Sequence, residues 1–586
     1  MRSFIGLILL AFVLALLLAY SRFTSGANIS GSHSNRTWLI KKKLLVPCSP
    51  TASFSWRDSS LESVPALPGW GHRSWKITTH SDSAQFYFNQ GINLYYGFHI
   101  IEAEASFKKA AVFDPDCAMA FWGQALAYGP NINDAGFYVE NQDAWLAIRK
   151  ANSFTKNISP EESALIKAQL VHYSPDSPVN RIALNNQYAN AMKKVYSRFS
   201  LNEEIAVLYA DALMNLHPWN FYYQNGNPKS WTPELTSLLE KILKKNPNHP
   251  AAVHYYIHAL EASNVAFKAI PYARKLDTLM PDVAHMVHMA SHIYIRAGMY
   301  KDGITSNVKA VEAYQKYVSL FPPSEGNSVL YYLHNVDMGA TLATMAGMYE
   351  LSNNSFRVAS ENINQYGLPM METGGGLGEY IQFLFIQPVL NDVRFGKWDS
   401  ILIHAPIDEK FVHACALWHF ARGMAQLKKG DTTAAKMEWE EVTKKIHAPS
   451  MELRYGPFNR GADAAQLAAN ILEGEIALTA GNTYSAIELL KKAVDIEMKM
   501  NYNEPADWRI PARHFLGAAL LKTGQPAAAE KVYRQDLIKN PNNVWSLKGL
   551  EIALRDQQKS IQAKAVAQHF KISSSRADIV INTSAF

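Results

Sequence analysis

Histidine is the residue of this sequence with the most distinctive spacing. Five of the 19 histidines in this 586-residue chain fall between residues 254 and 292. His254 and His288 are 34 residues apart, and so are His258 and His292. Within each helix the pair is spaced by four residues, which puts both imidazoles on one helical face. Such a repeated register predicts a metal or ligand site rather than scattered core residues.

The residue types in this cluster suit a transition metal ion. Neutral imidazole nitrogen binds Zn, Cu, Fe and Ni, and a carboxylate partner shifts the preference toward Fe or Zn. We therefore expect Fe, Cu or Zn, and three or four nitrogens would leave an open position for catalysis. The three cysteines are far apart, so no thiolate zinc site is predicted. The predicted ligands are the clustered histidines and one nearby carboxylate: His254, His258, Glu261, His285, His288 and His292.

Two other interpretations of the cluster stay open. The imidazoles could line a pocket for an anionic or aromatic ligand, or they could pack within helices rich in methionine and tyrosine. A protease-type metal motif is absent, because Tyr255 follows His254 where the HExxH motif has its glutamate. The sequence alone does not decide whether the protein is an enzyme.

The spacing of 34 residues recurs along much of the chain. Counting from Ala84, the positions that carry aromatic, small and proline residues in a helix–turn–helix repeat are occupied by Tyr87, Gly91, Ala103, Phe107, Ala110 and Pro115. Further repeats with partial matches start at Pro250, Ala284, Ala416, Leu467 and Ile510. Small residues at positions 8 and 20 allow the two helices of a repeat to approach closely. This pattern favours helix pairs from about residue 84 to 560.

These motifs resemble the tetratricopeptide-repeat superfamily. The segments around Trp122, around His254 to Glu261 and around His285 to His292 also resemble a family of large, histidine-rich tetratricopeptide proteins. The resemblance implies an all-α solenoid of antiparallel helix pairs, and it carries no activity with it. In structures of the superfamily, positions 2, 5, 9 and 12 of the first helix line the concave groove in which ligands bind.

The histidine cluster falls on this groove stripe. His334 and Asp337 continue the stripe in the next repeat, and His514 takes position 5 of the repeat that starts at Ile510. We therefore expect side chains of adjacent helices, packed about 8–10 Å apart, to converge on one ion or on two neighbouring ions. All six predicted ligands share the stripe, with His254 and His288 at position 5, His258 and His292 at position 9, His285 at position 2 and Glu261 at position 12.

The two ends of the chain differ from the repeats in composition. An apolar run from Phe4 to Ala19 follows a single charge, Arg2, and predicts a signal peptide or an N-terminal membrane anchor, and hence an extracytoplasmic protein. Net charge is only +6, without a basic stripe, so nucleic-acid binding is not predicted. The predicted divisions are 1–21 (signal peptide or anchor), 22–80 (flexible tether), 81–320 (repeats with the histidine-rich groove), 321–415 (irregular helical section), 416–560 (C-terminal repeats) and 561–586 (tail).

Two functions follow from the sequence. The first is an extracytoplasmic repeat protein with a histidine-rich metal site in its groove. If the metal is catalytic, the groove also holds a small molecule or peptide. The alternative is a scaffold that binds a peptide or protein without metal, as many solenoid proteins do. Metal dependence separates the two.

Overall fold

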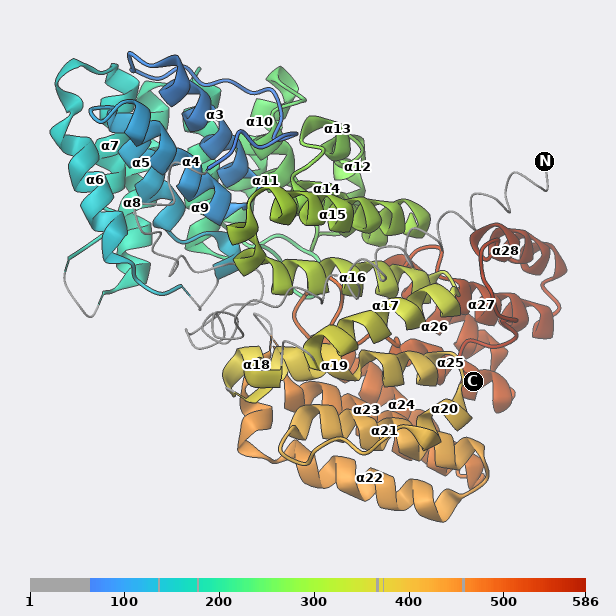
Figure 1. The fold of residues 1–586 in the computed structure, drawn as a ribbon. Coiled ribbons are helices and arrows are strands. Elements are labelled where there is room, and N and C mark those ends of the chain that lie inside the picture. Colours follow the sequence, from blue (N-terminus) through green and yellow to red (C-terminus); the bar gives the residue numbers. More distant parts are fainter. Residues whose placement is uncertain (1–63, 135–137, 176–178, 365–367, 373, 456–458) are drawn as a thin grey trace, which may run out of the picture. The chain divides into compact units, whose positions relative to one another are not determined.

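The computed structural model describes residues 64–134, 138–175, 179–364, 368–372, 374–455 and 459–586 (Figure 1). The predicted signal peptide or anchor lies outside these residues. No helix among the described residues is both long and apolar enough to cross a membrane.

The described part of the chain is almost entirely helical. Its first half contains α3 (Asp82–Tyr96), α4 (Ile100–Phe113), α5 (Ala118–Tyr128), η2 (Ile132–Asp134), α6 (Gln142–Ser153), η3 (Thr155–Asn157), α7 (Pro160–Leu170), α8 (Arg181–Arg198), α9 (Glu203–Leu216), α10 (Thr232–Lys245), α11 (Pro250–Leu260), η4 (Ala266–Ala269), α12 (Ile270–Ala273), α13 (Leu276–Leu279), α14 (Ala284–Arg296) and α15 (Tyr300–Leu320).

The second half continues the succession of helices. It contains η5 (Pro322–Asn327), α16 (Ser328–Met345), α17 (Tyr349–Asn362), α18 (Leu368–Glu372), α19 (Gly375–Arg394), α20 (Trp398–Ile403), α21 (Val412–Lys428), α22 (Thr432–Ile446), η7 (Pro449–Glu452), the two-residue antiparallel strands β1 (Arg454–Tyr455) and β2 (Asn459–Arg460), α23 (Gly461–Thr479), α24 (Thr483–Lys499), α25 (Ala512–Lys522), α26 (Pro526–Lys539), α27 (Val544–Asp556) and α28 (Ser560–Ser573).

Most repeats predicted from the sequence are pairs of contacting helices: α3 with α4, α14 with α15, α21 with α22, α23 with α24, and α25 with α26. The small residue at position 8 has the predicted role. A Cβ atom at Gly91 would lie 2.8 Å from the Phe107 ring, and one at Gly517 would lie 2.4 Å from the Tyr533 ring. Gly298, in the turn between α14 and α15, has a φ of +67°, which favours glycine. The predicted all-α array of tetratricopeptide-type helix pairs is confirmed for the described residues.

The repeat that starts at Pro250 departs from this pattern in its second half. Its first helix, α11, is followed by three short segments, η4, α12 and α13, instead of one long second helix. Pro271 lies in the first turn of α12, where its missing N–H is tolerated, and it cannot continue a preceding helix. α11 nevertheless contacts both α9 and α14, so the first histidine helix stays within the stack.

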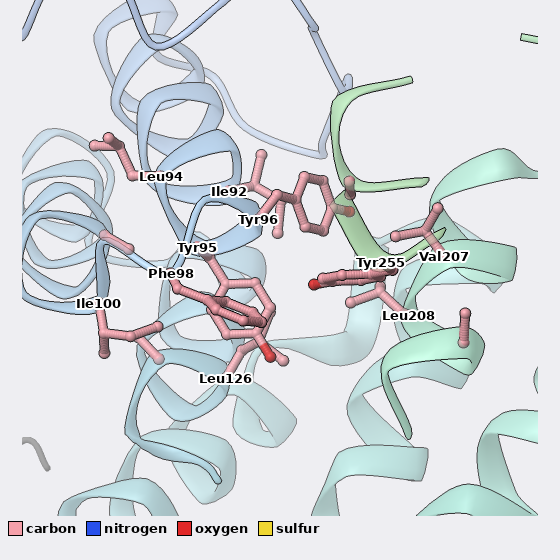
Figure 2. Close-up of a cluster of buried hydrophobic side chains, with 14 of the residues drawn as sticks. Ile92, Leu94, Tyr95, Tyr96, Phe98, Ile100, Leu126, Val207, Leu208 and Tyr255 are labelled. Atoms are coloured by element: carbon pink, nitrogen blue, oxygen red, sulfur yellow. The ribbon is translucent and has the colours of Figure 1, made fainter. Parts of the chain in front are cut away.

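Two large hydrophobic cores hold the helices together. One extends from Val64 to Phe321, and the other from Leu333 to Ala563. Figure 2 shows part of the first core, where Phe98 and Tyr255 extend toward each other with ring centroids 6.1 Å apart. In α11 and α14 the histidines are interspersed with residues of this core, such as Tyr255 and Met289.

Hydrogen bonds between distant residues connect the repeats. The Tyr317 hydroxyl donates to the Pro68 carbonyl at 2.8 Å, and the Tyr300 hydroxyl donates to the Pro541 carbonyl at 2.7 Å. The Trp545 indole donates to the Thr344 carbonyl at 2.9 Å. Within the segment 561–586, Ile581 and Ser584 are buried. Neighbouring repeats are therefore not the only parts of the chain in contact.

Candidate metal centre

Three helices carry the clustered histidines. α11 begins with Pro250 at its first turn, after His249, whose side chain accepts a hydrogen bond from the Ala252 backbone N–H. α14 contacts both α11 and α16, so the three helices lie close together (Figure 1). All five predicted histidines and Glu261 are at most 4% exposed.

The histidines form two sets of three. The first set is His254, His258 and His285, and the second is His288, His292 and His334. In each set one nitrogen of every imidazole lies within 4.8 Å of a nitrogen of the other two. His334, from α16, was placed on the same stripe by its register, and the structure puts its ring centroid 4.6 Å from that of His288. We call these the first and second histidine sets.

In the first set, two imidazoles are oriented by hydrogen-bond acceptors. His254 Nδ1 lies 2.6 Å from the Tyr96 carbonyl oxygen, and His258 Nδ1 lies 2.9 Å from a carboxylate oxygen of Glu261. Both partners accept only, so each Nδ1 must carry the proton, and each Nε2 presents a lone pair. The two Nε2 atoms lie 3.1 Å apart.

The second set repeats this arrangement. His292 Nδ1 lies 2.5 Å from the other carboxylate oxygen of Glu261, and His288 Nδ1 lies 2.7 Å from the side-chain oxygen of Asn307. The Asn307 amide nitrogen donates to the Gly303 carbonyl, which leaves its oxygen toward the imidazole. The Nε2 atoms of His288 and His292 are 2.8 Å apart.

Facing lone pairs repel each other unless a cation lies between them. Burial lowers the pKa of His254 and His288 well below the ordinary value, so a proton is a poor cation here. Two nitrogens bound to one tetrahedral ion at about 2.0–2.1 Å are about 3.3 Å apart. Each Nε2 pair therefore has nearly the separation that two ligands of one metal ion require.

Glu261 connects the two sets. Its two carboxylate oxygens accept from imidazoles of different sets, at His258 and His292. Burial alone would raise the pKa of this carboxyl, but the two imidazoles lower it to about 2. Glu261 thus remains ionised and orients the imidazoles from their far side, the usual role of a carboxylate behind a metal-bound histidine.

His285 differs from the other members of the first set. Neither of its ring nitrogens has a hydrogen-bond partner among the described residues, although the side chain is buried. Leaving a buried donor unsatisfied costs about 1–3 kcal/mol. The His285 side chain lines a cavity of about 10 Å³ together with Phe98, Tyr314 and Tyr331. His285 therefore has a nitrogen free for a ligand.

Two aromatic residues with unusual backbone cover the first set. Phe98 lies 4.5 Å from the His254 ring, and Trp219 lies 5.2 Å from the His258 ring, measured between centroids. Their φ angles are 56° and 58°, in the left-handed region that bulky side chains rarely adopt. Strained backbone of this kind is concentrated at functional sites.

The C-terminal repeats contribute charged groups near the second set. Arg509 forms an ion pair with Asp337 at 2.6 Å, one helical turn from His334. Glu504 is buried beside His292, and the Tyr502 hydroxyl donates to it at 2.5 Å. Burial raises the pKa of Glu504 to about 7. A carboxyl with this pKa can hold or release a proton near neutral pH.

One expectation from the sequence needs correction. The stripe is not an open groove, because its histidines are buried and Phe98 and Trp219 pack against the first set. His514 stands at an equivalent register position but does not join the cluster. It accepts from Arg394 and donates to Asp536, so both its nitrogens are occupied.

Sequence reasoning missed several residues of the site. Asn307 could have been found, because it stands at position 24 of its repeat, where Phe107 and Tyr533 are aromatic. Tyr96 contributes through its backbone carbonyl, which leaves no signal in the side chain. Phe98 and Trp219 show no pattern that connects them with histidines so far along the chain.

No protein-family model matches the chain, and no curated protein does. Among solved structures it is similar to the human IFIT1 dimer with m7Gppp-AAAA, at 11% identity and a TM-score of 0.32, over 89% of this chain and 99% of that chain. It is also similar to yeast Tom70, at 13% identity and a TM-score of 0.27, over 85% of this chain and 91% of that chain. At these values neither likeness bears on what this chain binds.

Proposed function

We propose that this protein is a metal-binding helical-repeat protein whose buried imidazoles hold a transition metal ion, Fe, Cu or Zn. The observation that carries the proposal is the orientation of four Nε2 atoms toward one another at 3.1 and 2.8 Å, with every Nδ1 held by an acceptor. His254, His258, His288 and His292 are the ligands this orientation supports first. His285 adds a nitrogen without a partner, and Glu261 acts from behind the ligands.

The burial of the site also supports metal binding over peptide binding. A peptide groove needs accessible side chains, and the six predicted residues are at most 4% exposed. A bare metal ion can reach such a site where a peptide cannot. From the apolar N-terminal run we further propose that the protein functions outside the cytoplasm, which protease accessibility of intact cells would test.

Elemental analysis of the full chain, purified without a polyhistidine tag, tests the proposal. We expect near-stoichiometric Fe, Cu or Zn in the wild type and its loss in His258→Gln/His292→Gln, which keeps side-chain volume. The control is His404→Ala/His569→Ala, because both of these histidines are exposed and lie outside the cluster. This control should retain its metal, and circular dichroism should show that both variants are folded.

Absence of metal in the wild type, even after incubation with each ion, would overturn the proposal. Equal metal content in the wild type and in His258→Gln/His292→Gln would overturn the assignment to this cluster. The first result would favour the alternative, a scaffold that binds a peptide or protein without metal, and the second would place the metal site elsewhere in the chain.

A further inference from the structure

The two histidine sets lie next to each other, at distances close to the widest separation within one set. Across the sets, the ring centroids of His285 and His288 are 6.0 Å apart, and those of His258 and His292 are 6.2 Å apart. Within the first set, His258 and His285 are 6.1 Å apart. Since each set offers three nitrogens, ions held by both sets would be close neighbours.

The charges around the two sets restrict the kind of ion. All six candidate ligands are imidazoles, which bind a metal ion as neutral ligands, and Glu261 is a carboxylate that accepts from two of them through their Nδ1 atoms. Burying charge without compensation is costly, so ions of low charge are favoured. Imidazole ligands suit copper, and monovalent copper brings the smallest charge among the candidate ions.

The space beside His285, in the first set, restricts the size of a further ligand. The cavity beside His285 measures about 10 Å³ and is bounded by Phe98, Tyr314 and Tyr331. That is about the space that one water molecule needs. Sugars, nucleotides and peptides do not fit, whereas a molecule of two or three atoms does.

From these observations we infer that the two histidine sets hold a pair of copper ions, one in each set, as a single centre that binds dioxygen or a similarly small ligand. The inference rests on the proposed metal-binding function and specifies its ions and its ligand. The electron balance is simple. Each of two monovalent copper ions loses one electron and becomes divalent, and dioxygen gains both electrons and becomes peroxide, with no proton transferred. The His285 side of the first set is where the ligand would enter.

Copper loading of the full chain tests this inference. The metal-free protein is reconstituted with monovalent copper without oxygen, and bound copper is counted. Oxygen is then added, and its uptake and the electron paramagnetic resonance spectrum are measured. We expect about two copper ions per chain, about one dioxygen per two copper ions, and a spectrum of interacting spins or no signal at all.

Single-site variants separate the two sets. His334→Gln removes a ligand of the second set alone and should leave about one copper ion per chain, with the spectrum of an isolated divalent ion after oxidation by a chemical oxidant. The matched control His404→Gln, at an exposed position, should retain two interacting ions. A variant with two ions and unchanged coupling would show that His334 is not a ligand.

Several outcomes would overturn the inference while leaving metal binding intact. These are one ion per chain in the wild type, two ions with independent spins, or stoichiometric zinc or iron that copper does not replace. Binding of two copper ions without oxygen uptake would overturn the ligand assignment. Failure to bind any metal would overturn the proposed function itself, so the two failures are distinguishable.

Discussion

Position 5 of the repeat carries histidine in three places, and the surroundings of these histidines differ. His254 and His288 each use Nδ1 to reach an acceptor and direct Nε2 at another imidazole. His514 receives a hydrogen bond from Arg394 at 3.0 Å on Nδ1 and donates from Nε2 to Asp536 at 2.9 Å. The repeat register buries all three imidazoles, but only the first two retain a free lone pair.

The difference shows that partners, rather than register, decide what a buried histidine can do. Both kinds of partner occupy positions where the repeat normally has another residue type. Asn307 replaces an aromatic residue at position 24 and orients His288, whereas Asp536 replaces alanine at position 27 and occupies His514. A residue that departs from the repeat pattern opposite a histidine therefore indicates whether that histidine keeps a free nitrogen.

The largest expected effect concerns metal removal. Because an ion bound only to the folded state stabilises it by about 4 kcal/mol at a thousandfold excess over Kd, a chelator should lower the melting temperature of the wild type by several degrees. The same treatment should not shift His258→Gln/His292→Gln. Differential scanning calorimetry measures both. If the chelator lowered both melting temperatures equally, these histidines would not bind the stabilising ion, and the contrast between the histidine sets and His514 would be wrong.

Replacing the partner of His514 should destabilise the protein without removing metal. Asp536 is fully buried and also accepts from Asn543 and Ser546. Asp536→Asn replaces a carboxylate oxygen with an amide NH₂ group, which cannot accept the hydrogen bonds that converge on this side chain. Breaking a buried pair such as Asp536 with His514 costs about 3–5 kcal/mol. Urea denaturation should show this loss, with metal content unchanged. Asp556→Asn, at an exposed site, is the control, and metal loss in Asp536→Asn would break the comparison.

Asp211, a buried carboxyl with a single hydrogen-bond donor, should make stability depend on pH in the opposite direction to Asp536. Asp211 accepts from the Tyr95 hydroxyl at 3.1 Å, and burial raises its pKa to about 7. The folded state therefore holds this proton more tightly than the unfolded chain, whose carboxyl titrates near the ordinary value of about 3.9. Stability contributed by Asp211 is present below pH 4 and is lost as pH rises to 7.

Asp211→Asn removes this pH dependence. Relative to the wild type, the variant should gain stability from pH 4 to 7, reach about 4 kcal/mol, and gain nothing further above pH 7. Urea denaturation at several pH values measures the difference. A difference that does not change with pH would contradict the raised pKa.

The smallest expected effect concerns helix spacing. Gly517 stands at position 8 against Tyr533, whereas Ser291 stands at the same position of the second histidine repeat. Gly517→Ser should overpack this contact and cost about 2 kcal/mol. The control Ala527→Ser, at an exposed position, should cost little, and thermal denaturation compares them. If Gly517→Ser cost little stability, the two helices of this repeat would be no closer together than those of the repeat that contains Ser291.

The sequence predicted the helix pairs and the convergence of histidines well, because both follow from local spacing. Glycine at position 8 and histidine at positions 5 and 9 act within a repeat or between neighbours. The closure of the site was not predictable in this way. Phe98 is 156 residues from His254, and Arg509 is 172 residues from Asp337, so no local period connects them. The division of the ligands into two sets also needed coordinates.

The long-range hydrogen bonds bear on how the molecule folds and unfolds. A linear array of repeats unfolds unit by unit, because each repeat contacts only its neighbours. Here Tyr317 reaches Pro68, Tyr300 reaches Pro541, and Trp545 reaches Thr344, each across some 200 residues or more. Closing such loops is slow and raises the contact order. We therefore expect one cooperative unfolding transition for the helical body, with the histidine sets assembled late in folding.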